Sequence, residues 1–299
     1  MSIHRKSILY ILTAAVLWGC TGVFFKELST LGLTPMRVVF LRTSLAALGL
    51  GGWLLIRDRD LLRIKKQDFW CFIGTGLISL LFFNWCLYEA ISRNGLAVSA
   101  VLLYTAPAFV AVLSAWLFGE KLSLSRSCIL VVVLIGCALV SGVMGITDIS
   151  FEGVLFGLGS GIGYALYSIF GRYALNREYR PQTIAFYTFL LCAIGSGLLS
   201  FIPADAVWSA IPAGNPYLWL LAITLASVGC LFPYWLYTKG LENVTGAQAS
   251  MTATPEPVVA ALLGVFIYHE TLSVWQIAGA VMILGSILLL AKLTDKKLT

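Results

Sequence analysis

One carboxylate stands in an apolar stretch where a charge is costly. Glu256 lies between two prolines in the run Thr254-Pro255-Glu256-Pro257, near the centre of the apolar segment 246–268. A carboxylate at the centre of a bilayer costs about 2.5–3.5 kcal/mol or more unless it is paired, hydrated or protonated. Such a group can take up a proton or bind a substrate cation. The open alternative is a structural carboxylate that pairs with Arg42 or with backbone groups freed by the prolines.

Prolines interrupt two apolar segments at the same depth. Pro107 lies in segment 96–118, and Pro257 lies equally far into segment 246–268 with Pro255 beside it. A proline inside a helix removes one backbone hydrogen bond and clashes with the preceding turn. Paired helix breaks of this kind point to a binding site near the bilayer midplane, although transmembrane helices also tolerate proline as a harmless kink.

Polar and aromatic residues recur at helical spacing in these segments. Gln248, Thr252 and Glu256 share one helical face, and Tyr164 and Tyr167 share a face of segment 153–173. Such faces should turn away from lipid and line a pocket for a partly apolar, zwitterionic solute. Because Trp and Tyr also gather at membrane interfaces, simple anchoring stays an alternative for some of them. The candidate substrate-binding residues are Trp18, Asn84, Tyr88, Tyr104, Tyr164, Tyr167, Tyr234, Gln248, Thr252 and Glu256.

The elements that must position these residues are membrane-spanning helices. The chain has 299 residues, of which 59% are hydrophobic and 11% charged, and its mean hydropathy is +0.91. That is more apolar surface than a soluble core can bury. The apolar runs are continuous rather than alternating, which predicts helices and no strands. Ten windows are long enough to cross a bilayer: 7–25, 36–56, 69–89, 96–118, 125–144, 153–173, 182–202, 217–238, 246–268 and 274–292.

Basic residues predict the orientation. If the spans alternate in direction, only Lys26 and Arg93 fall between spans on one side. Lys and Arg concentrate in cytoplasmic loops, so we expect both termini in the cytoplasm and the chain in the cytoplasmic membrane. The basic residues expected on the cytoplasmic side are Arg5, Lys6, Arg57, Arg59, Arg63, Lys65, Lys66, Lys121, Arg126, Arg172, Arg177, Arg180, Lys239, Lys292, Lys296 and Lys297.

The two halves of the chain repeat each other. Near the start of each half, residues match at an offset of 146 positions. Phe24-Phe25-Lys26 correspond in this way to Phe170-Gly171-Arg172. Each half, 7–144 and 153–292, holds five predicted spans, and an odd number inserts the second copy upside down. Inverted halves around a central cavity are typical of transporters. At an offset of 150 positions, Ala97, Pro107, Glu120, Leu122 and Ser123 recur as Ala247, Pro257, Glu270, Leu272 and Ser273.

These segments resemble a known family. The run from Pro107 to Ser123, its counterpart from Glu256 to Ser273, Trp18-Gly19 and the segment from Gly279 to Gly285 are similar to the EamA domains of the drug/metabolite transporter superfamily. The resemblance implies ten helices in two EamA repeats and the export of amino acids or other metabolites. Glu is common in the family at position 256. His269 departs from the family's pattern, which has Gly before the Glu.

Other functions lack the residues they need. An intramembrane enzyme would require a nucleophile with a base, paired aspartates or metal ligands, and the only histidines are His4 and His269 at the segment edges. The basic residues form no dense tract for nucleic acid. No P-loop is present, so transport should be secondary, with protons as one coupling partner and no cofactor or metal. A channel or receptor stays as a further alternative, and the substrate and the oligomeric state stay open.

Overall fold

All regular secondary structure of the described residues is helical. The computed structural model describes residues 3–120, 123–143, 148–201 and 214–295, with the main chain alone at 201 and 291–295. Residue 144, where we expect the first repeat to end, and Lys121, Lys296 and Lys297 lie outside the described residues. No strand occurs within these ranges, as the continuous apolar runs predict.

The helices follow one another with short connections. Two short 3-10 turns, η1 (Arg59–Leu62) and η2 (Lys66–Asp68), join the second and third predicted spans. The α-helices are α1 (Ile3–Gly19), α2 (Thr21–Thr30), α3 (Pro35–Arg57), α4 (Phe69–Ile73), α5 (Phe82–Leu103), α6 (Ala106–Phe118), α7 (Leu124–Val140), α8 (Phe151–Leu175), α9 (Pro181–Phe201), α10 (Pro216–Leu225), α11 (Phe232–Leu241), α12 (Gly246–Thr252), α13 (Glu256–Tyr268) and α14 (Val274–Asp295).

Seven helical stretches of the described chain are long and apolar enough to cross a membrane. Three shorter apolar helices, Ala106–Phe118, Leu124–Val140 and Val274–Leu290, accompany them. One long stretch, Lys66–Leu103, contains a kink at Gly95 (φ 72°, ψ 173°), where the chain leaves the helical conformation. The number of ten spans and the inverted relation of the halves remain predictions.

Two helices begin at the proline-rich breaks. Helix α6 starts at Ala106 with Pro107 in its first turn, and α13 starts at Glu256 with Pro257 in its first turn. A proline fits there because the first-turn N–H groups of a helix have no partner within the helix. The breaks themselves therefore lie just before the prolines, at Tyr104-Thr105 and at residues 253–255.

Two π-helical segments interrupt the third and eighth predicted spans. They are η3 (Gly74–Leu81), which joins α4 to α5, and η5 (Ala226–Leu231), which joins α10 to α11. Both end at a leucine, and the two leucines are 150 positions apart. π-helical turns are rare and often occur at functional sites.

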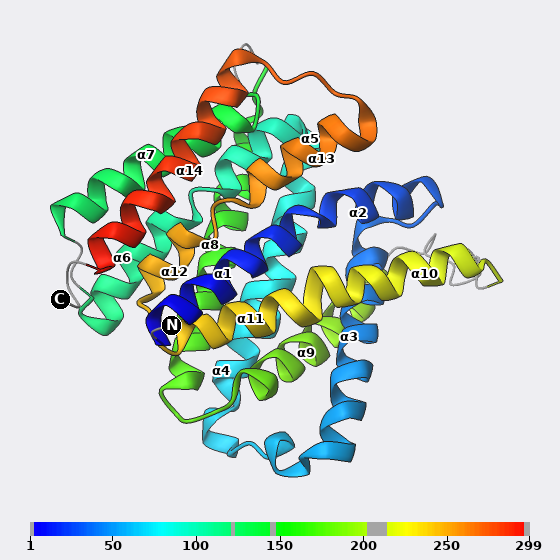
Figure 1. Cartoon of the computed structure of the whole chain (residues 1–299). Coiled ribbons are helices and arrows are strands. Elements are labelled where there is room, and N and C mark those ends of the chain that lie inside the picture. The colour runs from blue at the N-terminus through cyan, green and yellow to red at the C-terminus, as the bar shows by residue number, and fades with distance from the viewer. Residues whose placement is uncertain (1–2, 121–122, 144–147, 202–213, 296–299) are drawn as a thin grey trace.

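The helices form a single bundle in which α1, α5, α8 and α11 lie centrally (Figure 1). Helix α1 packs against α11, α5 against α8, α3 against α9, and α7 against α14. The helices α3, α8 and α11 all end on one side, which we call the basic end because it carries Arg57, Arg172 and Lys239. The opposite end holds the kink at Gly95 and the start of α8.

Candidate functional site

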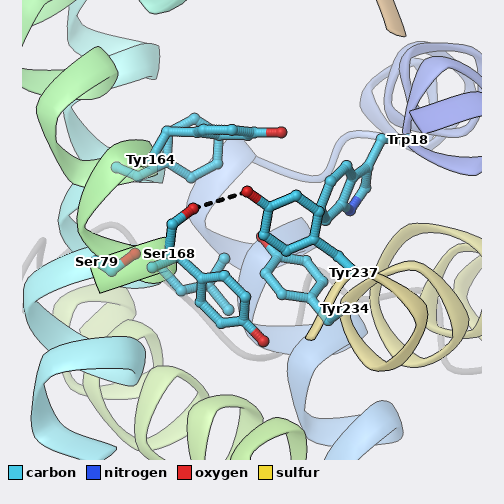
Figure 2. Close-up of a pocket in the computed structure, with 9 residues that line it drawn as sticks. Trp18, Ser79, Tyr164, Ser168, Tyr234 and Tyr237 are labelled. Carbon is cyan, nitrogen blue, oxygen red and sulfur yellow. Dashed lines mark hydrogen bonds between the residues drawn. The ribbon is translucent and has the colours of Figure 1, made fainter. Parts of the chain in front are cut away.

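A small enclosed cavity lies between α1, α8 and α11, with η3 and the start of α5 on its remaining side. Its volume is about 10 Å³, which is room for about one water molecule. Figure 2 shows Tyr164 and Ser168 of α8 opposite Trp18, Tyr234 and Tyr237 of α1 and α11. The residues that line it are Trp18, Ser79, Leu80, Phe83, Tyr164, Tyr167, Ser168, Tyr234 and Tyr237.

Aromatic rings close this cavity. The ring of Trp18 lies 5.2 Å from that of Tyr234 and 6.0 Å from that of Tyr164, both in edge-on contacts. Tyr167 meets Tyr234 edge-on at 4.9 Å. Edge-on pairs at these distances stabilise one another beyond the area they bury. Four candidates from the sequence, Trp18, Tyr164, Tyr167 and Tyr234, thus lie together in one cluster.

The polar atoms around the cavity are paired with one another. Tyr167 shares a hydrogen bond of 2.7 Å with Thr238, and Ser168 shares one of 2.8 Å with Tyr237 (Figure 2). Ser79 donates to the carbonyl of Gly163 at 2.7 Å. These bonds join α8 to α11 and to η3. A solute that entered between α8 and α11 would have to replace them.

Glu256 lies at the edge of the aromatic cluster. The hydroxyl of Tyr164 donates to its Oε2 over 3.4 Å, and the side chain is only partly buried. Helix α1 approaches the backbone of Glu256 so closely that a Cβ added at Gly19 would lie 2.8 Å from the Glu256 carbonyl oxygen. Gly19 therefore allows α1 to bring Trp18 beside the break between α12 and α13.

The alternative pairing of Glu256 with Arg42 is not formed. In the described chain Arg42 donates from Nη2 to Oδ1 of Asn84 at 2.8 Å, and its guanidinium lies 5.1 Å from the centre of the Phe25 ring. Arg42 and Asn84 are both buried. The two charged groups thus have separate neutral partners, Asn84 and Tyr164.

Other predicted site residues lie outside the cavity wall. Tyr88 is half-buried and packs on Phe25, near Arg42. Tyr104 ends α5 at the break before α6 and is also half-buried. Gln248 is buried at the start of α12, where its amide lies 3.2 Å from His4 of α1.

Thr252 is bonded within its own helix. Its hydroxyl donates to the carbonyl of Gln248, four residues earlier, at 2.8 Å. Gln248 and Thr252 do not line the cavity, and Glu256 of the same predicted face accepts a hydrogen bond from Tyr164.

Several residues of the site were not among our candidates. Tyr237 and Ser79 line the cavity, and Arg172 joins helix ends at the basic end. The spacing of Tyr234 and Tyr237, one helical turn apart, could have indicated Tyr237. No local signal indicates Ser79, since its role depends on the approach of α8 through Gly163.

Hydrogen bonds join several helix ends at the basic end. Nη1 of Arg172 donates to the carbonyls of Leu241 at 2.6 Å and Val244 at 2.9 Å. Its Nη2 lies 3.9 Å from Oε1 of Glu120, which also accepts from the backbone N–H of Gly246 at 3.4 Å. The ends of α6, α8 and α11 and the start of α12 are therefore joined. In the described ranges no three His, Cys, Asp or Glu side chains gather into a metal site.

Comparisons with known proteins agree with this architecture. A solved crystal structure of a protein superimposes with a TM-score of 0.82, covering 98% of this chain and 99% of the other at 19% identity, which shows the shared fold. An "Uncharacterized transporter" of Archaeoglobus fulgidus is 29% identical over 93% of this chain and 94% of its own length. The "Uncharacterized transporter YwfM" of Bacillus subtilis is 28% identical over 95% and 93%.

A family profile matches nearly the whole chain. The EamA-like transporter family matches twice, over residues 5–142 and 151–292. Together with the apolar helices, this match settles the class of protein. The chain is a multi-pass membrane protein that belongs to the EamA-like transporter family.

Proposed function

We propose that the chain is a secondary transporter that carries small solutes by alternating access. Ten membrane spans form two inverted halves, 7–144 and 153–292, and the aromatic cluster with Glu256 lies between them. The observation that carries the proposal is the difference in burial between the residues of this cluster. Tyr167, Tyr234 and Tyr237 are buried toward the basic end, whereas Tyr164 and Glu256 keep exposed surface.

Equivalent local structures in both halves support the inverted repeat. The π-helices end at Leu81 and Leu231, and the helices that follow the breaks, α6 and α13, begin and end 150 positions apart. Each of these two helices ends in a left-handed residue, Gly119 and His269. Repeated irregularities are stronger support than repeated apolar residues, because few sequences produce them.

The packing partners support the same relation. Helix α1 packs on α11, and its counterpart α8 packs on η3 and α5, the counterparts of η5 and α11. Helix α3 packs on its own counterpart α9, and α7 packs on α14. A two-fold axis in the membrane plane would produce these pairings, and such an axis lets the halves exchange roles as gates.

The chemistry of the cluster and the distribution of charge bear on substrate and direction. The aromatic walls and the carboxylate of Glu256 suit amino acids or related amphipathic solutes, and we propose export from the cytoplasm. The concentration of Lys and Arg at the basic end supports a cytoplasmic location of that end and of both termini. No P-loop occurs in the sequence, so we propose an ion gradient, with protons as the coupling ion, as the energy source.

The decisive experiment measures transport by the purified chain in liposomes. Counterflow of labelled amino acids would establish exchange, and uptake driven by an imposed proton gradient would establish coupling. Glu256→Gln keeps the shape of the side chain and removes its charge. We expect this variant to lose gradient-driven accumulation and to retain exchange. Asp60→Asn is the matched control, because Asp60 is 78% exposed and far along the chain from the cluster.

Four outcomes separate the alternatives. Normal accumulation and an unchanged pH profile in Glu256→Gln would remove this residue from coupling and favour facilitated transport. Loss of stability with normal coupling in the surviving protein would assign Glu256 a structural role. Flux through the protein without counterflow would favour a channel, and absence of any solute movement would reopen a receptor or an intramembrane enzyme.

A further inference from the structure

Arg42 is a buried cation without a carboxylate partner. It lies in the first half of α3 and is 6% exposed. In the described part of the chain it forms one hydrogen bond, to Asn84, and its Nε is buried without a hydrogen-bond partner. A charge inside a membrane is costly, so such residues pair with one another, face a cavity or bind a ligand. The structure offers Arg42 a neutral amide and an aromatic ring, neither of which neutralises its charge.

The surroundings hold the guanidinium in a fixed position. Nδ2 of Asn84 donates to the carbonyl of Leu80 in the π-helix η3 at 2.7 Å, which directs Oδ1 toward Arg42. Phe25 stacks on the guanidinium from α2. Arg42 is thus positioned by Asn84 of α5 on one side and by Phe25 of α2 on another, while its Nε has no hydrogen-bond partner among the described residues. A preorganised guanidinium of this kind is suited to a carboxylate, whose two oxygens match its donors.

Arg42 adjoins the aromatic cluster through Phe25. The Phe25 ring contacts Tyr88, and both pack in one hydrophobic cluster with Tyr234. Tyr234 contacts Trp18, Trp18 contacts Tyr164, and Tyr164 donates to Glu256. Arg42 and Glu256 are therefore linked to the same aromatic cluster, through Phe25 and through Tyr164. Phe25 and Tyr88 keep exposed surface.

We propose that Arg42 binds the carboxylate of the transported solute. The site accordingly takes carboxylate-bearing solutes, amino acids among them. This inference deepens the proposed transport function and rests on it. Asn84 is the positioning residue. The Leu80 carbonyl holds its side-chain amide, and its Oδ1 in turn holds the Arg42 guanidinium. Asn84 does not itself need to touch the solute.

The test uses matched pairs of compounds that differ in the carboxylate. The purified full chain in detergent is titrated with L-phenylalanine, L-leucine, L-glutamine and L-alanine, and with the amide of each. The readout is the concentration that gives half-maximal thermal stabilisation. For the acids that bind, we expect this concentration to be at least about tenfold lower than for their amides, because a hydrogen bond to a charged group is the stronger kind.

Three variants assign the preference to Arg42. Arg42→Gln should bind acid and amide equally, and Arg42→Lys should keep part of the preference as a point charge. Asn84→Asp places a carboxylate beside the guanidinium, so it should raise the midpoint of thermal unfolding without ligand and abolish the acid preference. Arg37→Gln is the matched control on the same helix and should behave as the wild type. A merely structural Arg42 would leave the preference unchanged in Asn84→Asp.

Two results would overturn the proposal. One is the absence of an acid preference in every pair, including the case in which no acid stabilises the wild type. The other is a preference that persists in Arg42→Gln. Neither result touches the transport function itself, because counterflow of amines or neutral solutes in liposomes would sustain that function without a carboxylate site.

Discussion

The two ends of the bundle carry a cation and a glutamate at repeat-related positions, yet their contacts differ. At the basic end Arg172 donates to two backbone carbonyls and approaches Glu120. At the opposite end Lys26 lies 3.4 Å from the centre of the Tyr268 ring. In the described ranges Lys26 and Glu270 form no ion pair. At these repeat-related positions one end therefore has charge-assisted hydrogen bonds and the other a cation–π contact. Elsewhere at the opposite end, Arg93 of α5 pairs with Glu152 of α8 at 3.3 Å.

This difference bears on the proposed alternating access. Charge-assisted hydrogen bonds to backbone carbonyls fix helix ends relative to one another, whereas an exposed cation–π contact contributes about 0.5–1 kcal/mol. In the proposed cycle the basic end would accordingly be the closed gate. In the proposed cycle Lys26 and Glu270 would take the role of Arg172 and Glu120 when the opposite end closes.

The largest expected effect is that of removing Arg172. Arg172→Ala loses two charge-assisted hydrogen bonds and leaves the carbonyls of Leu241 and Val244 without their donor. We expect the free energy of unfolding, measured by titration with SDS, to fall by about 3 kcal/mol or more. Cysteine probes placed at the basic end should at the same time become more reactive.

Arg180→Ala is the control for this variant. Arg180 is exposed at the same end of the bundle, and it should change the free energy of unfolding by less than about 0.5 kcal/mol. Equal effects of the two substitutions would contradict the assignment of Arg172 as a contact that closes the basic end.

The helix ends at the two gates allow a second comparison. Gly119 ends α6 with φ 66°, and His269 ends α13 with φ 55°, a conformation that favours glycine. The N–H of Glu120 and that of Glu270 bond to equivalent carbonyls, of Ser114 and Gly264. His269→Gly should therefore stabilise the protein by about 0.5–1 kcal/mol, and Gly119→His should destabilise it by about 1–2 kcal/mol.

Thermal unfolding of both variants measures this prediction. A Cβ at position 119 would meet no atom within 4 Å, so the loss in Gly119→His reports backbone strain rather than a clash. A lower stability of His269→Gly would contradict this prediction. It would show that contacts of the imidazole stabilise the protein by more than the left-handed backbone at His269 destabilises it.

The smallest expected effect on stability is that of Lys26→Ala. Its contact with the Tyr268 ring is exposed, so the free energy of unfolding should fall by at most about 1 kcal/mol. The rate of counterflow should fall more strongly, because the closed form of the opposite end needs the cation. Normal counterflow in Lys26→Ala would show that the two gates do not use equivalent residues.

The sequence by itself determined the helical class, the family and the positions of the irregular features. Continuous apolar runs exclude strands in lipid, and the match of Pro107 with Pro257 placed the two helix breaks at equivalent depth. These inferences depend on composition and on spacing along one helix. Such properties are local, and therefore they can be read without knowing how the helices pack.

Only the tertiary structure decided which polar groups meet. From the sequence, Arg42 was a possible partner of Glu256, and Gln248 belonged to one polar face with it. In the fold Arg42 bonds to Asn84, and Gln248 lies beside His4. A partner is set by the rotation of each helix and by close approaches such as that of α1 at Gly19 to Glu256. Small rotations of a helix exchange one neighbour for another, and no local spacing encodes them.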